Sequence, residues 1–322
     1  MKPFKFRPYL KSTIWGGSKI APFKGVSTDL ENIGESWEIS AVPGNESVVA
    51  DRGLRDDADV GKTLPELIEE YKGALVGDAV YAKFGSRFPL LVKFIDSRQN
   101  LSVQVHPDDE LAAKRHNCPG KTEMWYIIKT DPGAKIFAGL RKSITPGDFE
   151  KMVSGDQEGN PFEDVIACQE SHDGDLYFLP AGRLHAIGAG NFLAEIQETS
   201  DITYRVYDFG RKDANGRPRE LHTALAKDAI DYRVMPEYRS SYDTTKPVSE
   251  LVSSPFFKVS RVIVQSAAEV DFKSESFVVA MCIGGEANVN GVEVRQGETL
   301  LVPADENVLR VFGNATFLTA TM

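Results

Sequence analysis

The sequence predicts a mainly β fold of two small double-sheeted β-barrels that carry small helical insertions. Most of the chain consists of short strand-like segments broken by Gly and Pro. One strand-turn-strand unit also occurs twice, because GDLYFLPAGRLH, from Gly174, aligns without gaps on GETLLVPADENV, from Gly297. A glycine-acid turn, an apolar strand and a proline-containing turn are typical of hairpins in such barrels. We therefore expect a first domain at 1–235 and a second at 248–322.

Local patterns predict the elements of the first 100 residues. The first 50 residues contain short strand-like pieces such as ESWEIS, in which Trp37 and Ile39 alternate with polar residues. LPELIEEYKGALVGDAVYA has apolar residues at helical spacing behind a Thr63 cap and Pro65, which predicts one or two helices in an insertion at about 60–85. PLLVKFID is a nearly continuous apolar run of strand length. This part is therefore expected to be β structure with one helical insertion.

The remaining elements follow from similar signals. PDDELAAKRHN places Pro and acids before helix formers, which predicts a short helix, and strands are expected at MWYIIKT and AKIFAGL. TPGDFEKMVSG and PFEDVIACQE predict a second helical insertion at about 145–170, after which GDLYFLPAGRLHAIG returns to β structure. A mainly helical and polar stretch at 220–250 is expected to join the two domains. The Asn-Gly pair in IGGEANVNGVEVRQ predicts a hairpin turn in the second domain.

Composition and charge exclude several classes of function. The 322 residues are 42% hydrophobic and carry a formal net charge of −10, which argues against nucleic acid or a membrane surface as the main partner. The N-terminal segment lacks the apolar core of a signal peptide, and no run approaches the ~18 apolar residues that span a bilayer. Cys118, Cys168 and Cys282 are odd in number and widely spaced, which fits reduced thiols. We expect a cytoplasmic protein.

Four residues of the first domain form a candidate metal site. Gln104 and His106 stand two apart in QNLSVQVHPDDE, and side chains at i and i+2 leave a strand on the same face. Glu123 in GKTEMWYII and His185 in LPAGRLHAIG belong to further strands of the same barrel. A buried Glu123 would be costly without a cation. Zn²⁺ accepts imidazole and carboxylate ligands at ~2.0–2.2 Å, and Gln104 is the least usual ligand of the four.

The other histidines lack this context. His116, His172 and His222 are expected to be ordinary core or surface residues. In the second copy of the repeat, Val308 falls opposite His185. The second barrel is therefore expected to lack the metal ligands and to be structural.

Several of these motifs together resemble those of the type I phosphomannose isomerases in their shorter bacterial form. The similar runs are QNLSVQVHPDDELA, GKTEMWY, LPAGRLHAIG, EIQETSDITYRVYDFGR and, near the N-terminus, GESWEIS. The likeness extends to about Arg211 and, more weakly, through the second barrel. It implies two cupin-type (jelly-roll) barrels and a zinc-dependent interconversion of mannose 6-phosphate and fructose 6-phosphate. It also implies that Gln104, His106, Glu123 and His185 hold the zinc.

The same resemblance implies roles for four further residues. Lys93 and Lys121 would lie in the substrate pocket, Arg205 at its reactive end, and Glu195, ten residues before Arg205, at the position of a pocket glutamate. From the sequence alone, Arg205 could equally form a surface salt bridge, and Lys93 could be a strand-end lysine with its ammonium in water. The chain has only small helical insertions, so the phosphate contacts that longer relatives make through extra helical segments are not carried over to it.

Aldose–ketose isomerisation of a sugar phosphate needs a Lewis acid, a base and a holder for the phosphate. Zinc would polarise the carbonyl and stabilise the enediolate, and Arg205 and the lysines would supply positive charge. For the proton transfer we favour Glu195, with zinc-bound water or Lys121 as the alternatives. Each of these groups would need a pKa tuned toward neutrality.

Two other kinds of function remain open from the sequence. The same ligands could hold Fe²⁺ in a dioxygenase, although such sites usually use more histidines, or the barrel could be a non-enzymatic sugar-phosphate sensor. Lys93, Lys121 and Arg205 favour the isomerase, because an anionic sugar needs cations that an apolar oxygenase substrate does not. Either a monomer or a homodimer fits the sequence.

Overall fold

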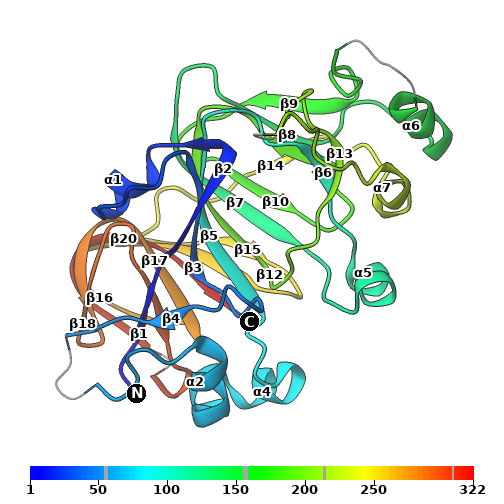
Figure 1. Ribbon diagram of the computed structural model, residues 1–322. Coiled ribbons are helices and arrows are strands. Elements are labelled where there is room, and N and C mark those ends of the chain that lie inside the picture. The colour runs from blue at the N-terminus through cyan, green and yellow to red at the C-terminus, as the bar shows by residue number, and fades with distance from the viewer. Residues whose placement is uncertain (54–56, 155–158, 213–214, 307) are drawn as a thin grey trace.

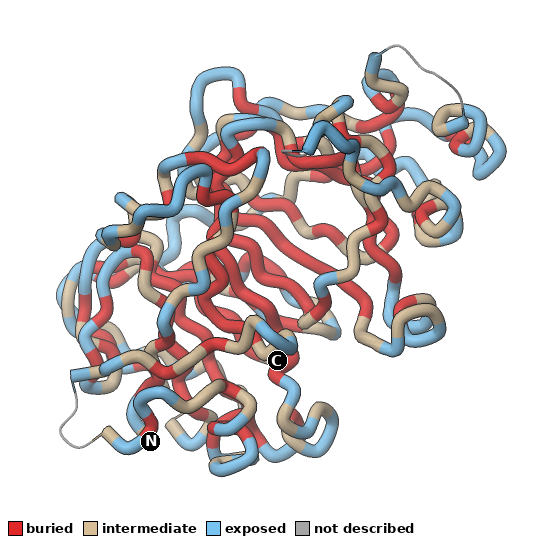
Figure 2. Tube along the Cα trace, in the orientation of Figure 1, coloured by how far each residue is buried: buried red, intermediate tan, exposed pale blue. Residues whose placement is uncertain are grey.

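The mainly β fold class is confirmed by the computed structural model, which describes residues 1–53, 57–154, 159–212, 215–306 and 308–322. In these ranges the strands form three antiparallel sheets of seven, five and eight strands (Figure 1). Buried residues concentrate on the central strands, whereas the helices and loops are mostly exposed (Figure 2). None of the helices in the described ranges is long and apolar enough to cross a membrane.

The first barrel consists of the seven- and five-stranded sheets. The larger sheet has the order β14-β10-β7-β12-β5-β2-β3, formed by Arg239–Ser240, Leu176–Leu179, Glu123–Thr130, Asn191–Glu198, Leu90–Ser97, Tyr9–Gly17 and Ile33–Ile39. The smaller has the order β13-β6-β11-β8-β9, formed by Tyr204–Tyr207, Val103–Val105, His185–Ile187, Lys135–Leu140 and Ile166–Glu170. Apolar side chains from both sheets share one core cluster, so the two sheets face each other.

The larger sheet is buried on both faces, which explains its nearly continuous apolar strands. On β12, Leu193 packs in the cluster between the two sheets of the first barrel, while Ala194 and Ile196 pack in a second cluster on the opposite face. That second cluster also contains residues of the C-terminal sheet, such as Val279 and Leu318. Alternate side chains of one strand therefore pack into two different cores. The side chains that point between the two sheets of the first barrel are the ones that can form a functional site.

The eight-stranded sheet forms the second barrel. Its main path is β15-β16-β20-β17-β19-β1-β4, with β18 paired to β17. These strands are Val248–Ser253, Lys258–Asp271, Val308–Thr321, Val278–Val289, Thr299–Val302, Phe4–Arg7 and Val48–Val49, with β18 at Val292–Arg295. The long strands surround their own apolar cluster. Because β1 and β4 come from the N-terminal part of the chain, the two barrels are joined by strand pairing, and the boundaries at 235 and 248 stay a prediction.

The internal repeat has the same local structure in both copies. β10 and β19 begin at equivalent positions, Leu176 and Thr299, and β11 and β20 begin at His185 and Val308. The predicted hairpin turn is also confirmed, since two residues separate β17 from β18 and both Asn290 and Gly291 have positive φ angles, 48° and 87°.

Short helices lie at the edges of the sheets. They are α1 Ile20–Lys24, α2 Leu64–Tyr71, α3 Gly73–Val76, α4 Asp78–Phe84, α5 Asp109–His116, α6 Pro146–Val153 and α7 Thr223–Ala229, with a 3₁₀ turn at Ala304–Glu306. Thr63 caps α2 in a reciprocal capping box with Glu66. The Asp108 side chain accepts from Leu111 N–H at the start of α5. The insertion at about 60–85 is thus helical as predicted, with three short helices.

Two predicted helical regions are partly wrong. In the insertion at about 145–170, only α6 is helical; residues 155–158 lie outside the described part, and Ile166–Glu170 form β9. Strand β9 pairs with β8 through contacts such as Lys135 with Glu170, and this pairing overrides local helix preference. Of residues 220–250, only α7 is helical.

Candidate metal centre

Strand pairing in the smaller sheet brings three of the predicted site residues into one row. Gln104 on β6 is the direct partner of His185 on β11 and of Arg205 on β13. His106 follows two residues after Gln104. Glu123 begins β7 in the opposing sheet. Because the two sheets face each other, these side chains converge from both sides of the barrel.

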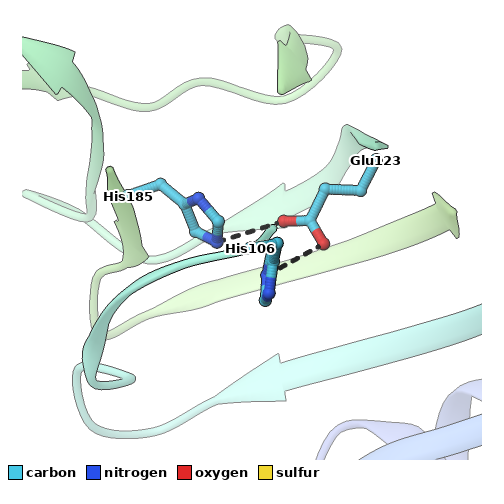
Figure 3. A group of neighbouring side chains, drawn as sticks. All are labelled: His106, Glu123 and His185. Carbon is cyan, nitrogen blue, oxygen red and sulfur yellow. Dashed lines mark ion pairs between the residues drawn. The ribbon is translucent and has the colours of Figure 1, made fainter. Parts of the chain in front are cut away.

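His106, Glu123 and His185 form a buried cluster whose candidate ligand atoms all lie within 4.8 Å of one another. Each of the three residues is 1% exposed. The Nε2 atom of His106 lies 3.5 Å from one Glu123 oxygen, and Nε2 of His185 lies 3.2 Å from the other (Figure 3). It is the one such group of His, Cys, Asp and Glu in the part of the chain that the structure describes.

Hydrogen bonds fix the orientation of both imidazoles. Nδ1 of His106 donates to the Ile202 carbonyl at 2.9 Å, and Nδ1 of His185 donates to the Arg183 carbonyl at 2.8 Å. Each Nε2 therefore carries a lone pair that points at the carboxylate of Glu123.

The cluster lacks the hydrogen bonds that buried polar atoms normally have. Both Nε2 atoms and both carboxylate oxygens of Glu123 are buried without a hydrogen-bond partner. With Glu123 ionised, four acceptors face one another and repel, and unsatisfied buried polar groups are rare in folded proteins. A divalent cation would satisfy all four, so the residues present fit a bound metal ion.

The pKa directions agree with this donor set. Burial lowers the pKa of His106 far below its ordinary value and that of His185 to about 4, so both imidazoles are neutral ligands at pH 7. Burial also raises the pKa of Glu123 to about 8, against the opposing effect of the Lys121 ammonium 3.5 Å away. An uncompensated carboxylate is thus disfavoured here, and a cation would restore its charge.

A second polar row crosses the larger sheet beside the metal cluster. Trp37, Lys93, Glu195 and Trp125 are successive cross-strand partners. The Lys93 ammonium lies 3.1 Å from Glu195 and 5.0 Å from the ring centre of Trp37, and Trp125 Nε1 donates to Glu195 at 2.9 Å. Lys93 is only 4% exposed, so it is not a strand-end lysine that extends into water.

Glu195 is held as an anion. Burial would raise its pKa, but the charges of Lys93 and Lys121 and the hydrogen bond from Trp125 outweigh burial, and the pKa lies below its ordinary value. The pKa of Lys93 is raised, because the charges of Glu195 and Glu35 outweigh burial. The pair is therefore ionised at neutral pH.

Arg205 is held by backbone rather than by a carboxylate. Its Nη1 donates to the Glu220 carbonyl at 2.9 Å, and its backbone N–H donates to Nδ1 of His222 at 3.3 Å. Its Nε is buried without a hydrogen-bond partner. Asp208, which could have formed a surface salt bridge with it, is instead paired with Arg211 and Arg219. Among the described residues, no carboxylate forms an ion pair with the Arg205 guanidinium, so its charge is not compensated by a direct partner, although Asp208 and Glu220 act on it from a distance.

A cavity of about 490 Å³ lies next to the metal cluster, since Gln104 and Lys121 are among the residues that line it. Its walls include every predicted substrate or catalytic residue, namely Lys93, Lys121, Glu195 and Arg205, together with the metal-site residue Gln104. Further lining residues that sequence reasoning did not single out include Lys11, Trp15, Glu35, Asp201 and Arg219. Trp15 lines this cavity and Trp37 of the ESWEIS segment lies beside it, but nothing local in the sequence indicated that they point inward.

Two carboxylates hold the GKTE segment from the side away from the metal cluster. Asp109 accepts from Gly120 N–H at 2.8 Å, and Glu198 accepts from Thr122 N–H at 2.7 Å. Lys121 lies between these two anchored positions. Gly120 has no room for a side chain, because a Cβ there would lie 2.6 Å from Asp109 N. Neither carboxylate was predicted from the sequence, although Asp109 lies in the quoted PDDE motif.

The Glu198 carboxyl is expected to make stability fall as pH rises. Burial raises its pKa to about 7 from the ordinary 4.5, although the hydrogen bond from Thr122 opposes this, so the folded protein binds the extra proton between those values. Stability from this group is complete below pH 4.5 and is lost as pH rises through 7, by about 3 kcal/mol at 1.36 kcal/mol per pH unit. Unfolding free energies measured in urea at pH 5 and pH 8 should therefore differ more in the wild type than in Glu198→Gln. Equal differences would contradict the assignment.

Two facing sheets with a buried His-Glu-His cluster and a cationic cavity define a cupin-fold protein with a metal-type centre. A model of the phosphomannose isomerase type I catalytic domain matches residues 4–126. The mannose-6-phosphate isomerase of Streptococcus mutans is 33% identical over 94% of this chain and 92% of its own, and ManA of Bacillus subtilis is 32% identical over 94% and 93%. The chain belongs to the type I phosphomannose isomerase family, and it is an aldose–ketose isomerase of that family.

The structural comparison agrees over the whole chain. The crystal structure of the mannose 6-phosphate isomerase from Bacillus subtilis superimposes with a TM-score of 0.86 at 32% identity, covering 100% of both chains. A phosphomannose isomerase mutant structure from Salmonella typhimurium has a TM-score of 0.81 at 16% identity, which shows a shared fold. The complete superposition includes the second barrel, so the two-barrel arrangement is a property of this family's fold.

Proposed function

We propose that the protein interconverts mannose 6-phosphate and fructose 6-phosphate through an enediol intermediate, with Zn²⁺ as its metal. The observation that carries this proposal is the set of four unpartnered acceptors on His106, Glu123 and His185 beside a cavity lined by cations. Family membership supports the same activity.

His106, Glu123 and His185 would hold the ion, with Gln104 as a fourth ligand. Two neutral imidazoles and one carboxylate suit zinc, and Gln104 lies in the same strand row as His185. Bound there, zinc would polarise the substrate carbonyl and stabilise negative charge on the enediolate.

The protein's own cations would bind and orient an anionic sugar. Arg205 presents its guanidinium to the cavity, and Lys121 lies between the metal cluster and the open space. Lys93 shares its charge with Glu195 and holds that carboxylate in place. These groups favour a sugar phosphate over the apolar substrate of an iron dioxygenase.

For the proton transfer we propose Glu195, because it is an anion at neutral pH and faces the cavity. Its lowered pKa keeps it deprotonated throughout the neutral range, but this shift runs away from neutrality, opposite to the tuning expected of a base from the sequence. Lys121 is the competing candidate, since it lies beside Glu123 on the same wall. If Glu195 is the base, kcat/KM should not fall through loss of the basic group as the pH is lowered through the neutral range, because the pKa of Glu195 lies below its ordinary value.

The proposal is tested by incubating the zinc-loaded protein with fructose 6-phosphate in D₂O. An enediol route predicts formation of mannose 6-phosphate with deuterium at C2, which NMR detects directly. Glucose 6-phosphate and unphosphorylated fructose serve as specificity controls. Oxygen consumption without isomerisation would support the dioxygenase instead, and tight sugar-phosphate binding without turnover would support a sensor.

A further inference from the structure

The cavity beside the metal cluster has more positive than negative groups on its walls. Its cations are Lys11, Lys93, Lys121, Arg205 and Arg219, and its acids are Glu35, Glu195 and Asp201. A phosphate monoester carries a charge of about −1.5 to −2 at pH 7. Which cation binds it depends on which ones are free of carboxylate partners.

Three of the five cations already have carboxylate partners. Lys93 lies 3.1 Å from Glu195, and Lys121 lies 3.5 Å from the candidate metal ligand Glu123. Arg219 makes two hydrogen bonds to Asp208, at 2.7 and 2.6 Å. Because Asp208 is shared with Arg211, however, this group of three keeps a net positive charge.

Lys11 differs from the other lysines of the cavity. Across the described ranges, no carboxylate lies within ion-pair distance of its ammonium, and its strand partner Glu35 accepts instead from Trp37 Nε1. The ammonium lies 5.0 Å from the ring centre of Trp37, which also receives Lys93 at 5.0 Å. A cation–π contact of this kind orients the side chain but leaves its three donors free.

Lys11 lies away from the metal cluster, because β12 and β5 separate its strand β2 from β7, which carries Glu123. Residues 11–15 of β2 line the cavity together with residues 203, 205 and 219. Gln104 marks the end next to the metal cluster, where Arg205 is its strand partner. If the carbonyl carbon binds there, as proposed above, the phosphate at the other end of the sugar needs cations on the remaining walls.

We infer that Lys11 binds the phosphate group of the sugar substrate, and that Arg219 adds positive charge to the cavity. This inference rests on the proposed function for the identity of the substrate. It makes Lys11 a binding residue that acts on ground state and transition state alike, so its removal should raise KM and leave kcat nearly unchanged.

The experiment compares Lys11→Ala and Lys11→Gln with the wild type in the zinc-loaded, full-length protein. We expect KM for fructose 6-phosphate to rise about 10- to 100-fold with kcat within about threefold, the range of one charge-assisted hydrogen bond. The inhibition constant of inorganic phosphate should rise in parallel, and Lys11→Arg should restore most of the affinity. Lys142→Ala, a change of an exposed lysine, is the matched control.

Direct calorimetric binding of fructose 6-phosphate separates this inference from the proposed function. Lys11-dependent binding without turnover in the wild type would contradict the isomerase and leave the Lys11 assignment standing. Normal turnover with unchanged KM and phosphate inhibition in both Lys11 variants would overturn the assignment and leave the isomerase standing. A fall in kcat at constant KM would also overturn it, because Lys11 would then act in the chemical step.

Discussion

Replacing His185 by alanine is expected to remove bound zinc and to lower turnover at least about 1,000-fold. The imidazole Nε2 is one of four acceptors that converge without hydrogen-bond partners, and no neighbouring side chain of the cluster can replace it. Lewis-acid stabilisation is worth several kcal/mol, and each 1.4 kcal/mol is a factor of ten in rate. Metal analysis of the purified variant and a turnover assay on the same sample measure both effects.

His172→Ala provides the control for this prediction. Its side chain is 61% exposed and lies outside the cluster, so metal content and turnover should stay at wild-type values. In the metal-free forms the His185 variant should unfold at a lower temperature than the wild type, because the buried imidazole packs against Trp125 and donates to the Arg183 carbonyl. Full zinc content and normal turnover in His185→Ala would show that the cluster is not the metal site.

Replacing Arg205 by alanine is expected to lower kcat about 100- to 1,000-fold while zinc stays at full content. Arg205 is the strand partner of Gln104, yet its guanidinium contacts the Glu220 carbonyl rather than the metal cluster. Its charge is therefore available to developing negative charge on the substrate, and losing one such donor typically costs this much. Steady-state kinetics with metal analysis test the prediction.

Arg141→Ala is the matched change at the surface, because Arg141 is 55% exposed and, within the described ranges, its ion pair is with Asp164 alone. It should leave kcat, KM and zinc content unchanged. Loss of zinc in Arg205→Ala would show instead that this arginine supports the β6–β13 pairing, and its role would be structural. An effect on KM alone would assign Arg205 to substrate binding without a part in the chemical step.

Only part of the metal cluster could be predicted from short-range strand geometry, and the full ligand set came from the resemblance to the family. Gln104 and His106 share a face through the two-residue repeat of a strand, and Glu123 is too costly to bury without a cation. The structure brings His106 and Glu123 together with His185 from a third strand. The repeat further predicted that the second barrel has Val308 where the first has His185.

The residues that support the cluster could not be predicted, because their partners are distant in the sequence. Glu198 holds the N–H of Thr122, 76 residues away, and nothing near either residue indicates this contact. Lys11 depends on the packing of β2 against Trp37. The strand at Ile166–Glu170 was likewise missed, since its stability comes from pairing with β8 rather than from its own residues.

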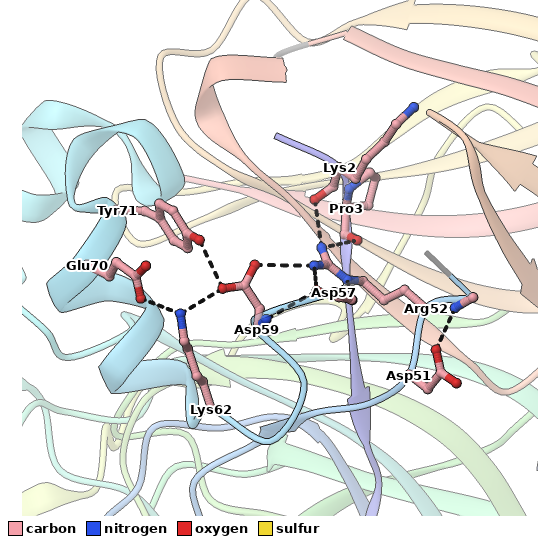
Figure 4. Close-up of polar contacts among 10 residues, drawn as sticks. Lys2, Pro3, Asp51, Arg52, Asp57, Asp59, Lys62, Glu70 and Tyr71 are labelled. Atoms are coloured by element: carbon pink, nitrogen blue, oxygen red, sulfur yellow. Dashed lines mark hydrogen bonds and ion pairs between the residues drawn. The ribbon is translucent and has the colours of Figure 1, made fainter. Parts of the chain in front are cut away.

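The attachment of the first helical insertion shows the same limit. Helix α2 was predicted from its cap and apolar spacing, but its contact with the N-terminal strand depends on a network of charges (Figure 4). Arg52 pairs with Asp57 and also donates to the Pro3 carbonyl at 3.2 Å, while Asp59 accepts from Lys62 and Tyr71, each at 2.9 Å. Such a network fixes one arrangement of neighbouring elements, and no single segment of sequence contains it.

Fructose 6-phosphate turnover and metal content should be measured on the same protein, as purified, after chelation, and after zinc is returned. We expect about one zinc per chain, loss of activity on chelation, and recovery in proportion to the zinc that binds. A chain that binds zinc fully at this site and converts no fructose 6-phosphate would contradict the isomerase. Activity that persists after complete removal of metal would contradict the role of the His106, Glu123 and His185 cluster.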